Sequence, residues 1–359
     1  MARIIAAVMG DSLGHLNQIL AVADGMREHE FLFVGGGTVL ELRRSGYQVE
    51  ELPVAGTLYA NNRLDVWATL TNGIKVNLGA PRIVHKVRRI IRDFDPALIL
   101  TSWEYFVPIV GRAMGKCCVS IDNQHFITKC RHDSPEGESM GRTLFWLSVR
   151  LRHFVAQRHI INTFFPVTPL DPSETDVFPP LIAPRVMKVA PSDGEHVLVY
   201  QTSPTFERLF TLLEEMPNRF VIYGFGERPA RKNLEFRAPS RERFVEELAS
   251  CRYVITNGGH TAISEALYFG KPVFAFPIHL AYEQYFNARM LAALGYGEYS
   301  MDPAPRGKMI QEFEKKTDLY RANIRGGDFC GNDKVIRRLQ EIVQSQESRI
   351  SAARTYSQE

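Results

Sequence analysis

Short apolar runs alternate with stretches of helical periodicity along the amino-terminal half of the chain. The stretches at 15–28 and 105–115 have the apolar spacing of amphipathic helices. The apolar runs have the length and composition of buried strands, and they lie at 3–10, 30–35, 47–52, 97–102 and 117–121. This alternation predicts an α/β fold in which helices cover both faces of a parallel sheet.

A proline-rich segment interrupts the pattern, which then starts again. Residues 171–195 contain five prolines and many turn-forming residues, a composition typical of a linker. Strands follow at 196–201, 219–225, 253–258 and 272–277, and helices at 205–216, 240–250, 261–269 and 282–294. The simplest architecture is two doubly wound, Rossmann-like domains that face a cleft. Because ligands of such sheets bind beyond the carboxyl ends of the strands, the cleft is the expected site.

The composition is that of an ordinary globular protein. Of the 359 residues, 45% are apolar and 23% are charged, and the net charge of +3 gives no argument for nucleic-acid binding. The five cysteines are odd in number and lack CxxC spacing, so we expect reduced thiols. No apolar run approaches the roughly 20 residues of a membrane span, and the first apolar run is too short for a signal peptide. These features predict a cytoplasmic protein.

The segment "ITNGGHTAISEALYFGKPVFAFP", residues 255–277, places polar residues where a strand should turn into a helix. Gly258 and Gly259 allow close backbone approach, and a helix that starts near Thr261 would point its N–H groups at the gap, which makes an anion site of phosphate size. Glu265 lies one turn later, where its carboxylate could accept hydrogen bonds from a ribose diol. An ordinary glycine turn, with Thr261 as cap and Glu265 stabilising the helix dipole, explains the same residues.

The next predicted helix adds polar residues at a second strand end. It begins with Glu283, Gln284 and Asn287. Together, the two segments resemble the donor-binding signature of GT-B-fold glycosyltransferases that use nucleotide sugars. The matching residues are Gly258, Gly259, Thr261, Glu265, Gly270, Pro272, Pro277, Glu283, Gln284, Asn287 and Ala288. Where many members carry histidine this chain has Asn257, and His260 is the alternative side chain for the phosphate contact.

The amino-terminal half resembles the same superfamily. In "MGDSLGHLNQILAVADGM", Gly10, Gly14 and His15 follow the first predicted strand in the order of the family's GxxGH loop. The resemblance implies that Gly14 lies at the donor and that His15 is the general base of an inverting enzyme. Imidazole suits that role because it titrates near neutrality. The alternative is a histidine that bonds locally at the start of a helix.

A general base is usually oriented by a carboxylate, and two acids are candidates for that role. In "LTSWEYF", Ser102 occupies the position where some members place the acid, which leaves Glu104 as the nearest carboxylate. In "SIDNQHFI", Asp122 ends the next predicted strand and could face the acceptor. Both candidates stay open, because either acid could be satisfied locally at the end of its strand.

Two further segments resemble parts of the donor site. Thr202 and Ser203 follow the strand at 196–201, where members of the superfamily carry a hydroxyl-bearing turn near the donor phosphates. Arg237 and Ala238, in "EFRAPS", stand where members hold the nucleobase with main-chain groups. The resemblance therefore adds Ser203 and Arg237 to the expected donor contacts.

Three charged segments have a structural explanation beside a functional one. Asp93 and Asp95 have the DxD spacing of a metal site, but Asp95 precedes a proline, as residues at the end of a helix often do. The resemblance also implies no metal, because GT-B enzymes generally need no divalent ion. We therefore expect no metal and no cofactor. The helix predicted at 82–92 would expose five basic residues, either to solvent alone or to anionic lipid headgroups. The segment 142–159 is also apolar and basic, without a clean polar face.

The resemblance implies an inverting glycosyltransferase that moves a sugar from a UDP-sugar to an acceptor hydroxyl of a glycolipid or a cell-envelope glycan. It assigns acceptor binding to a domain at 1–188, nucleotide-sugar binding to 189–330, and a helix that packs back on the first domain to 331–359. The expected location is the cytoplasm, with a peripheral contact at the inner membrane surface. A UDP-N-acetylglucosamine 2-epimerase and a non-catalytic nucleotide-sugar-binding partner protein are the alternatives. The sequence leaves the acceptor and the oligomeric state open.

Overall fold

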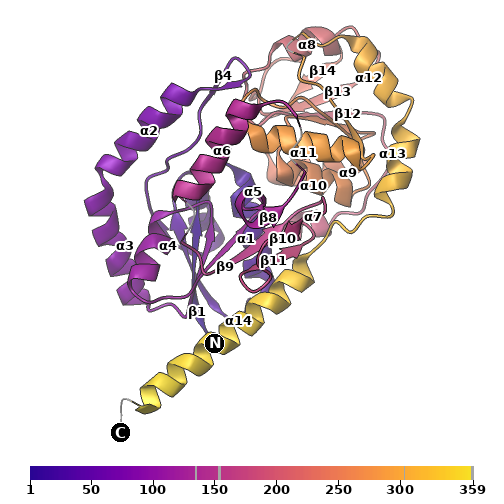
Figure 1. The fold of residues 1–359 in the computed structure, drawn as a ribbon. Helices are drawn as coiled ribbons and strands as arrows, with labels where there is room; N and C mark the ends of the chain where they lie inside the picture. Colours follow the sequence, from indigo (N-terminus) through magenta and orange to yellow (C-terminus); the bar gives the residue numbers. More distant parts are fainter. Residues whose placement is uncertain (134–135, 153–154, 303, 357–359) are drawn as a thin grey trace.

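The computed structural model describes residues 1–133, 136–152, 155–302 and 304–356. They form two lobes, each built on a parallel β-sheet that is covered by helices (Figure 1). The predicted α/β class and the pair of doubly wound domains are confirmed. Within these residues, no helix has both the length and the apolar composition that crossing a bilayer requires.

A seven-stranded parallel sheet forms the amino-terminal domain, in the order β11-β9-β7-β6-β1-β2-β3. Its strands are β1 (Arg3–Val8), β2 (Glu30–Gly35), β3 (Gln48–Glu51), β6 (Leu98–Ser102), β7 (Cys118–Asp122), β9 (Arg158–Asn162) and β11 (Thr175–Phe178). Two short antiparallel pairs are β4 (Tyr59–Ala60) with β5 (Arg63–Leu64), and β8 (Cys130–Arg131) with β10 (Thr168–Pro169). The strands β6 and β7 are buried throughout, as expected for a parallel sheet with both faces covered.

The helices around this sheet follow the apolar periodicity. They are α1 (Leu13–Gly25), the 3-10 helix η1 (Gly37–Ser45), α2 (Val66–Leu78), α3 (Ala80–Phe94), α4 (Phe106–Ala113), α5 (Phe126–Lys129) and α6 (Ser139–Arg152). In α3, Ile83 and Val87 are buried against the sheet, whereas Arg88 and Arg89 are exposed. The basic face that the sequence predicts for this helix is therefore on the surface.

A six-stranded parallel sheet forms the carboxyl-terminal domain, in the order β14-β13-β12-β15-β16-β17. Its strands are β12 (Val197–Tyr200), β13 (Phe220–Tyr223), β14 (Leu234–Phe236), β15 (Val254–Thr256), β16 (Val273–Ala275) and β17 (Gly297–Tyr299). Its helices are α8 (Arg208–Leu213), α9 (Arg241–Ser250), α10 (His260–Tyr268), α11 (Tyr282–Ala293), α12 (Gly307–Glu314) and α13 (Thr317–Ile324).

Both sheets are wound in two directions from one central strand. In the first sheet, the chain runs from β1 to β2 and β3 on one side and returns to β6 on the other, so the strand order reverses between β1 and β6. In the second sheet, the reversal lies between β12 and β15. Loops that leave the sheet at a reversal diverge and open a crevice at the carboxyl ends of the strands. The motif after β1 and the motif after β15 each lie at such a crevice.

The segment 171–195 is not an open linker, contrary to the prediction. Residues 175–178 form β11, which pairs in parallel with β9, and residues 184–187 form the short helix α7 (Pro184–Met187). Prolines did not prevent this structure because they flank the strand or occupy the first turn of α7, where the missing N–H costs nothing. The strands β9, β14 and β17 were also not predicted. In the segment 142–159, α6 ends at Arg152, residues 153–154 lie outside the described residues, and β9 begins at Arg158.

The carboxyl-terminal helix α14 (Asn332–Tyr356) returns to the amino-terminal domain and then projects beyond it (Figure 1). The side chains that it buries in the core of that domain are Val335, Leu339, Ile342 and Val343. Its first residue, Asn332, accepts a hydrogen bond from the N–H of Ile182 and donates one to the carbonyl of the same residue, both at 2.9 Å. These bonds hold the start of the helix against the chain that connects the two domains.

Aromatic side chains pack across the junction of the two domains. Phe126 on α5 lies 4.4 Å from Phe286 on α11, measured between ring centroids. Phe165, which follows β9, contacts both rings, at 5.6 and 5.3 Å. One continuous core cluster therefore contains residues of both domains. It sets the two crevices opposite each other.

Candidate active site

His15 lies in the first turn of α1, directly after the loop that follows β1. Its Nδ1 is 3.0 Å from the hydroxyl oxygen of Ser102 at the end of β6. Its ring stacks parallel to that of Trp103, with 6.1 Å between the centroids. The loop needs glycine at position 10, because a Cβ there would lie 1.7 Å from the carbonyl oxygen of Gly36. These contacts hold the imidazole at the crevice of the first sheet.

The surroundings of His15 favour the neutral imidazole. Burial lowers the pKa of His15 below its usual value of 6.5, and the carboxylates of Asp11 and Asp122 act in the opposite direction. A neutral ring can accept a proton near pH 7. Because Nδ1 is paired with Ser102, Nε2 is the nitrogen available for that proton.

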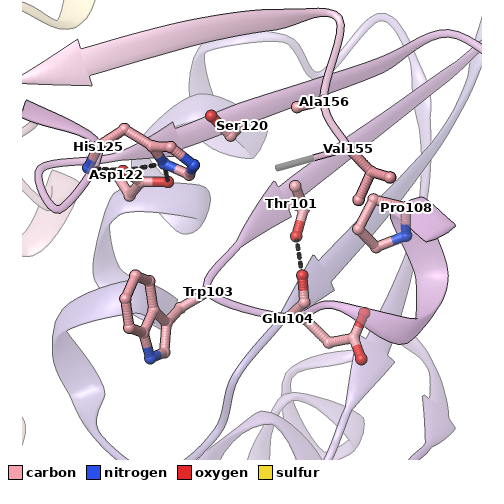
Figure 2. Close-up of a pocket in the computed structure, with 9 residues that line it drawn as sticks. All are labelled: Thr101, Trp103, Glu104, Pro108, Ser120, Asp122, His125, Val155 and Ala156. Atoms are coloured by element: carbon pink, nitrogen blue, oxygen red, sulfur yellow. Dashed lines mark hydrogen bonds and ion pairs between the residues drawn. The ribbon is translucent and has the colours of Figure 1, made fainter. Parts of the chain in front are cut away.

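Glu104 does not pair with His15, contrary to one of the two expectations. Its carboxylate accepts hydrogen bonds from the N–H groups of Phe106 and Val107, at 2.9 and 2.8 Å, at the start of α4. Figure 2 shows the Glu104 side chain pointing away from Asp122. The first N–H groups of a helix have no acceptors within the helix, and the carboxylate of Glu104 acts as their acceptor. Burial raises the pKa of Glu104 to about 7, while the backbone hydrogen bonds act to lower it.

Asp122 is held by His125, three residues further along the chain. It accepts hydrogen bonds from the backbone N–H of His125 at 3.0 Å and makes a 2.8 Å contact with Nδ1 of the same residue (Figure 2). The two residues line a small pocket together with Trp103 and Glu104. Asp122 is almost fully buried. It acts on His15 through its charge, whereas the hydrogen-bond partner of His15 Nδ1 is the hydroxyl of Ser102.

Asn257, which follows β15, holds two strand ends together and does not face the cleft. Its side-chain oxygen accepts a hydrogen bond from the N–H of Thr202 at 2.7 Å, and its amide group donates to Gln201 and to the carbonyl of Phe276. The side chain is fully buried. It therefore cannot make the phosphate contact that the resemblance assigned to this position. The same amide fixes the turn after β12, which carries Ser203.

Gly258 and Gly259 form the turn into α10. Gly258 has a φ of +90°, and a Cβ there would lie 2.7 Å from the carbonyl oxygen of Gln284. Gly259 is the N-cap of α10, and no side chain caps the helix there, so the cap that the sequence suggested at Thr261 is wrong. The first N–H groups of α10 are thus not bound by a capping side chain, as an anion site requires. A Cβ at Gly14 would lie 3.0 Å from the hydroxyl of Thr261, so the first turns of α1 and α10 lie against each other.

Two ionisable residues of α10 are buried with polar atoms that have no protein partner. Both ring nitrogens of His260 and Oε1 of Glu265 are in this state. Burial, with a smaller contribution from His15, lowers the pKa of His260 to about 3. Burial raises the pKa of Glu265 to about 7, and Arg185 acts to lower it. Buried polar atoms rarely stay unpaired, so these atoms suit a polar ligand between the two loops.

Arg185 is a residue of this region that the sequence interpretation missed. It lies in α7, within the segment interpreted as a linker, and its charge acts on Glu265. Its Nε is buried without a protein partner. The helix is a single turn beside a proline, so neither periodicity nor motif spacing could have indicated its role.

The first turn of α11 contacts the amino-terminal domain. Both carboxylate oxygens of Glu283 accept hydrogen bonds from the amide of Gln124, at 3.1 and 3.0 Å. Burial, which the bond from Gln124 opposes and the charges of Asp122 and Asp11 reinforce, raises the pKa of Glu283 to about 7. Gln284 accepts a hydrogen bond from the N–H of Ile278 and so stabilises the loop before α11.

The β4–β5 hairpin completes the site from the amino-terminal side. Burial raises the pKa of its Tyr59, and the charges of Asp11 and Glu283 add to the effect. The hairpin docks on the other domain through the N–H of Leu64, which donates to the carbonyl of His279 at 2.9 Å. The sequence interpretation missed this hairpin. The feature that could have indicated the hairpin is the pair Asn61 and Asn62. Both residues have positive φ, as a two-residue turn requires.

The remaining predicted donor residues lie on the carboxyl-terminal domain. Ser203 is buried in the turn after β12, beside the N–H group that Asn257 holds. The guanidinium of Arg237 forms ion pairs with Glu235 at 2.8 Å and Glu247 at 3.2 Å, which turn it away from a ligand. The backbone N–H of Arg237 is also taken, by the carbonyl of Ile222 at 2.9 Å.

The structure describes no group of three or more His, Cys, Asp or Glu side chains that could hold a metal ion. Asp95 has a φ of +43° and caps the end of α3, as expected for a residue that stops a helix before proline. It pairs with Arg3 and Lys116, and Asp93 pairs with Arg92. The DxD spacing therefore reflects a helix end.

Comparison with known proteins adds the family. The model for glycosyl transferase family 1 matches residues 2–316. An uncharacterized glycosyltransferase of Methanosarcina acetivorans is 24% identical over 380 residues, which cover 94% of this chain and 98% of that protein. A 104-residue match, 32% identical and 27% of each chain, is to the UDP-N-acetylglucosamine–N-acetylmuramyl-(pentapeptide) pyrophosphoryl-undecaprenol N-acetylglucosamine transferase of Amoebophilus asiaticus.

The solved structures similar to this chain have the GT-B fold. UGT2 of Phytolacca americana, in complex with UDP-2fluoro-glucose and pterostilbene, has a TM-score of 0.65 and 15% identity, with 96% of this chain and 99% of that chain covered. At this identity the likeness concerns the fold alone. It agrees with the two parallel sheets described above.

Proposed function

The chain belongs to glycosyl transferase family 1, and from that premise we propose that it transfers a sugar from a UDP-sugar to an acceptor hydroxyl with inversion at the sugar carbon. The observation that carries the proposal is the close approach of the first turns of α1 and α10. Gly14, next to His15, lies against Thr261 in the first turn of α10. A donor held at α10 would thus present its sugar to His15.

The donor is proposed to bind at the start of α10. Its diphosphate would meet the uncapped N–H groups there, together with His260, whose ring nitrogens lack protein partners. The ribose diol would bond to Glu265, which has an unpaired carboxylate oxygen, and Arg185 would add positive charge nearby. The charge that develops on the leaving UDP is then stabilised by groups that are already in place.

His15 is proposed as the general base. Its Nε2 takes the proton of the acceptor hydroxyl while that oxygen attacks the anomeric carbon, and the bond from this carbon to the diphosphate breaks on the opposite face. Ser102 and Trp103 fix the ring, so the base is oriented by a hydroxyl and an aromatic stack. Asp122 supplies negative charge that stabilises the imidazolium without a direct bond.

The acceptor is proposed to be a glycolipid or a cell-envelope glycan at a membrane surface inside the cell. The partial relative from Amoebophilus asiaticus is named for an acceptor with an undecaprenol chain. The charge of Asp11 acts on His15 and also on Tyr59 and Glu283, and polar groups of this kind suit a hydroxyl-rich acceptor.

The test compares His15→Ala with His85→Ala, an exposed histidine on α3 that serves as the matched control. UDP-sugar hydrolysis or transfer should fall by about 10²-fold or more in His15→Ala, while UDP should still raise its melting temperature. Turnover of the parent should fall in acid with an apparent pKa below 6.5, because burial lowers the pKa of His15. Parental turnover in His15→Ala would refute the general-base role. UDP stabilisation without any turnover of the parent would instead favour a non-catalytic nucleotide-sugar-binding protein.

A further inference from the structure

Exposed apolar side chains concentrate on two helices of the amino-terminal domain. Of the fourteen large apolar side chains that are exposed in the described part of the chain, eight lie on α2 and α6. The two helices are neighbours, since a Cβ at Gly73 on α2 would lie 3.0 Å from the guanidinium of Arg152 on α6. The α2–α6 face, as we use the term, consists of Trp67, Leu70, Ile74 and Leu78 on α2 with Leu147 and Leu151 on α6.

Helix α2 exposes most of its large apolar side chains, which a helix on a protein surface usually buries. Two of its polar residues bond to the rest of the protein: Asn72 donates to the carbonyl of Gly56 at 3.1 Å, and Thr69 accepts from the N–H of Leu58 at 3.0 Å. The four exposed large apolar residues of α2 fall within an arc of about 80° at 100° per residue. They face outward, and Trp67 and Leu78 are each 79% exposed. An apolar stripe of this kind marks a contact surface.

The helices of the face carry mostly positive charge, although Asp65 and Glu138 directly precede α2 and α6 and Lys86 pairs with Glu50. Neither α2 nor α6 contains an acidic residue, and α3, which follows α2, contains only Asp93, which pairs with Arg92. The three helices together carry nine basic residues: Lys75, Arg82, Lys86, Arg88, Arg89, Arg92, Arg142, Arg150 and Arg152. A partner of this surface must therefore offer an apolar interior and negative charge.

We propose that the α2–α6 face docks on an anionic lipid bilayer. Apolar side chains that enter the headgroup region, with basic residues beside anionic headgroups, match the composition of this surface. A second copy of the chain is the weaker occupant, because a symmetric contact would set basic residues against basic residues. Trp67 and Trp146 are the kind of side chain that settles at a membrane interface.

The docked face lies next to the catalytic cluster. Phe145 on α6 stacks on Trp103 with 6.3 Å between the ring centroids, and Trp103 stacks on His15. The hairpin that carries Tyr59 leads directly into α2. An acceptor whose lipid tail stays in the bilayer would thus bring its head group to the mouth of the cleft. This consequence for the acceptor rests on the proposed function, whereas the docking itself does not.

The experiment is sedimentation of the full chain with vesicles of phosphatidylcholine, with and without phosphatidylglycerol. The parent should bind the anionic vesicles at least tenfold more tightly than the neutral ones, and its tryptophan emission should shift to the blue. Trp67→Ser/Leu78→Ser should reduce the binding at least tenfold. The matched control is Leu319→Ser, a 59% exposed leucine on α13 of the other domain, which should bind as the parent does. Arg142→Glu/Arg150→Glu should remove most of the preference for anionic vesicles.

The docking proposal is overturned if the parent binds neither vesicle or if the double apolar variant binds like the parent. It is also overturned if the apolar variant instead converts a dimer of the parent to a monomer without vesicles. UDP should stabilise every variant equally, since the donor residues lie in the other domain. If UDP does not stabilise the parent protein, the transferase proposal is refuted, whereas the vesicle result is unaffected.

Discussion

Replacement of Gly258 by alanine tests whether the donor turn is built on close backbone contact. The residue has a φ of +90°, where an alanine costs roughly 1–2 kcal/mol. The new Cβ would also lie 2.7 Å from the carbonyl oxygen of Gln284, a backbone atom that cannot rotate away. Relief of such overpacking costs typically about 1–3 kcal/mol. The sum is a destabilisation of about 2–5 kcal/mol.

Gly270→Ala is the matched control, because Gly270 lies just beyond the other end of α10 with a φ of +74° and nothing within 4 Å of its added Cβ. The Gly270→Ala substitution should lower the free energy of unfolding only by the conformational cost of about 1–2 kcal/mol. Urea unfolding of both variants measures the difference. Gly258→Ala should also weaken UDP binding about tenfold or more, because any shift of Gly258 moves the first N–H groups of α10. Isothermal titration calorimetry measures this loss of affinity. Equal stability loss in the two variants, or parental UDP affinity in Gly258→Ala, would refute the reasoning.

Two further predictions concern the donor site. The pKa of Glu265 is raised to about 7 by burial, so the folded chain keeps a proton that the unfolded chain releases above about pH 4.5. The free energy of unfolding should therefore fall as the pH rises from about 5 to 8. In urea unfolding, Glu265→Gln should reduce that fall by up to ~3 kcal/mol. The same pH dependence in both proteins would contradict the assigned burial. Transfer should persist in excess EDTA, because helix N–H groups would meet the diphosphate charge; activity lost with EDTA and restored by Mg²⁺ or Mn²⁺ would disprove it.

The sequence alone was enough to predict the central strands of both sheets, the helices between them and the two loops of the site, but not the strands β9, β11, β14 and β17. The apolar pattern is a local property, and each predicted strand of the motif regions has the burial that its pattern indicates. The glycines at 10, 258 and 259 could be recognised for the same reason. A turn that requires close approach or positive φ selects glycine at its own position, whatever the rest of the chain does. The segment 171–195 shows the limit, since proline content cannot tell an open linker from the edge strand β11.

The partners of the side chains were decided by tertiary structure. Glu104 and Ser102 are two residues apart, yet only the path of the chain into α4 turns the carboxylate onto helix N–H groups and leaves the hydroxyl on His15. Asn257 bonds to the strand beside it, and Glu283 bonds to Gln124 in the other domain.

The outward apolar stripe of α2 likewise has the periodicity of a helix packed in a core, and the sequence cannot say which face is covered. Periodicity is set by neighbours along the chain. The partner of a side chain depends on segments that are distant in sequence, so only the folded chain determines it.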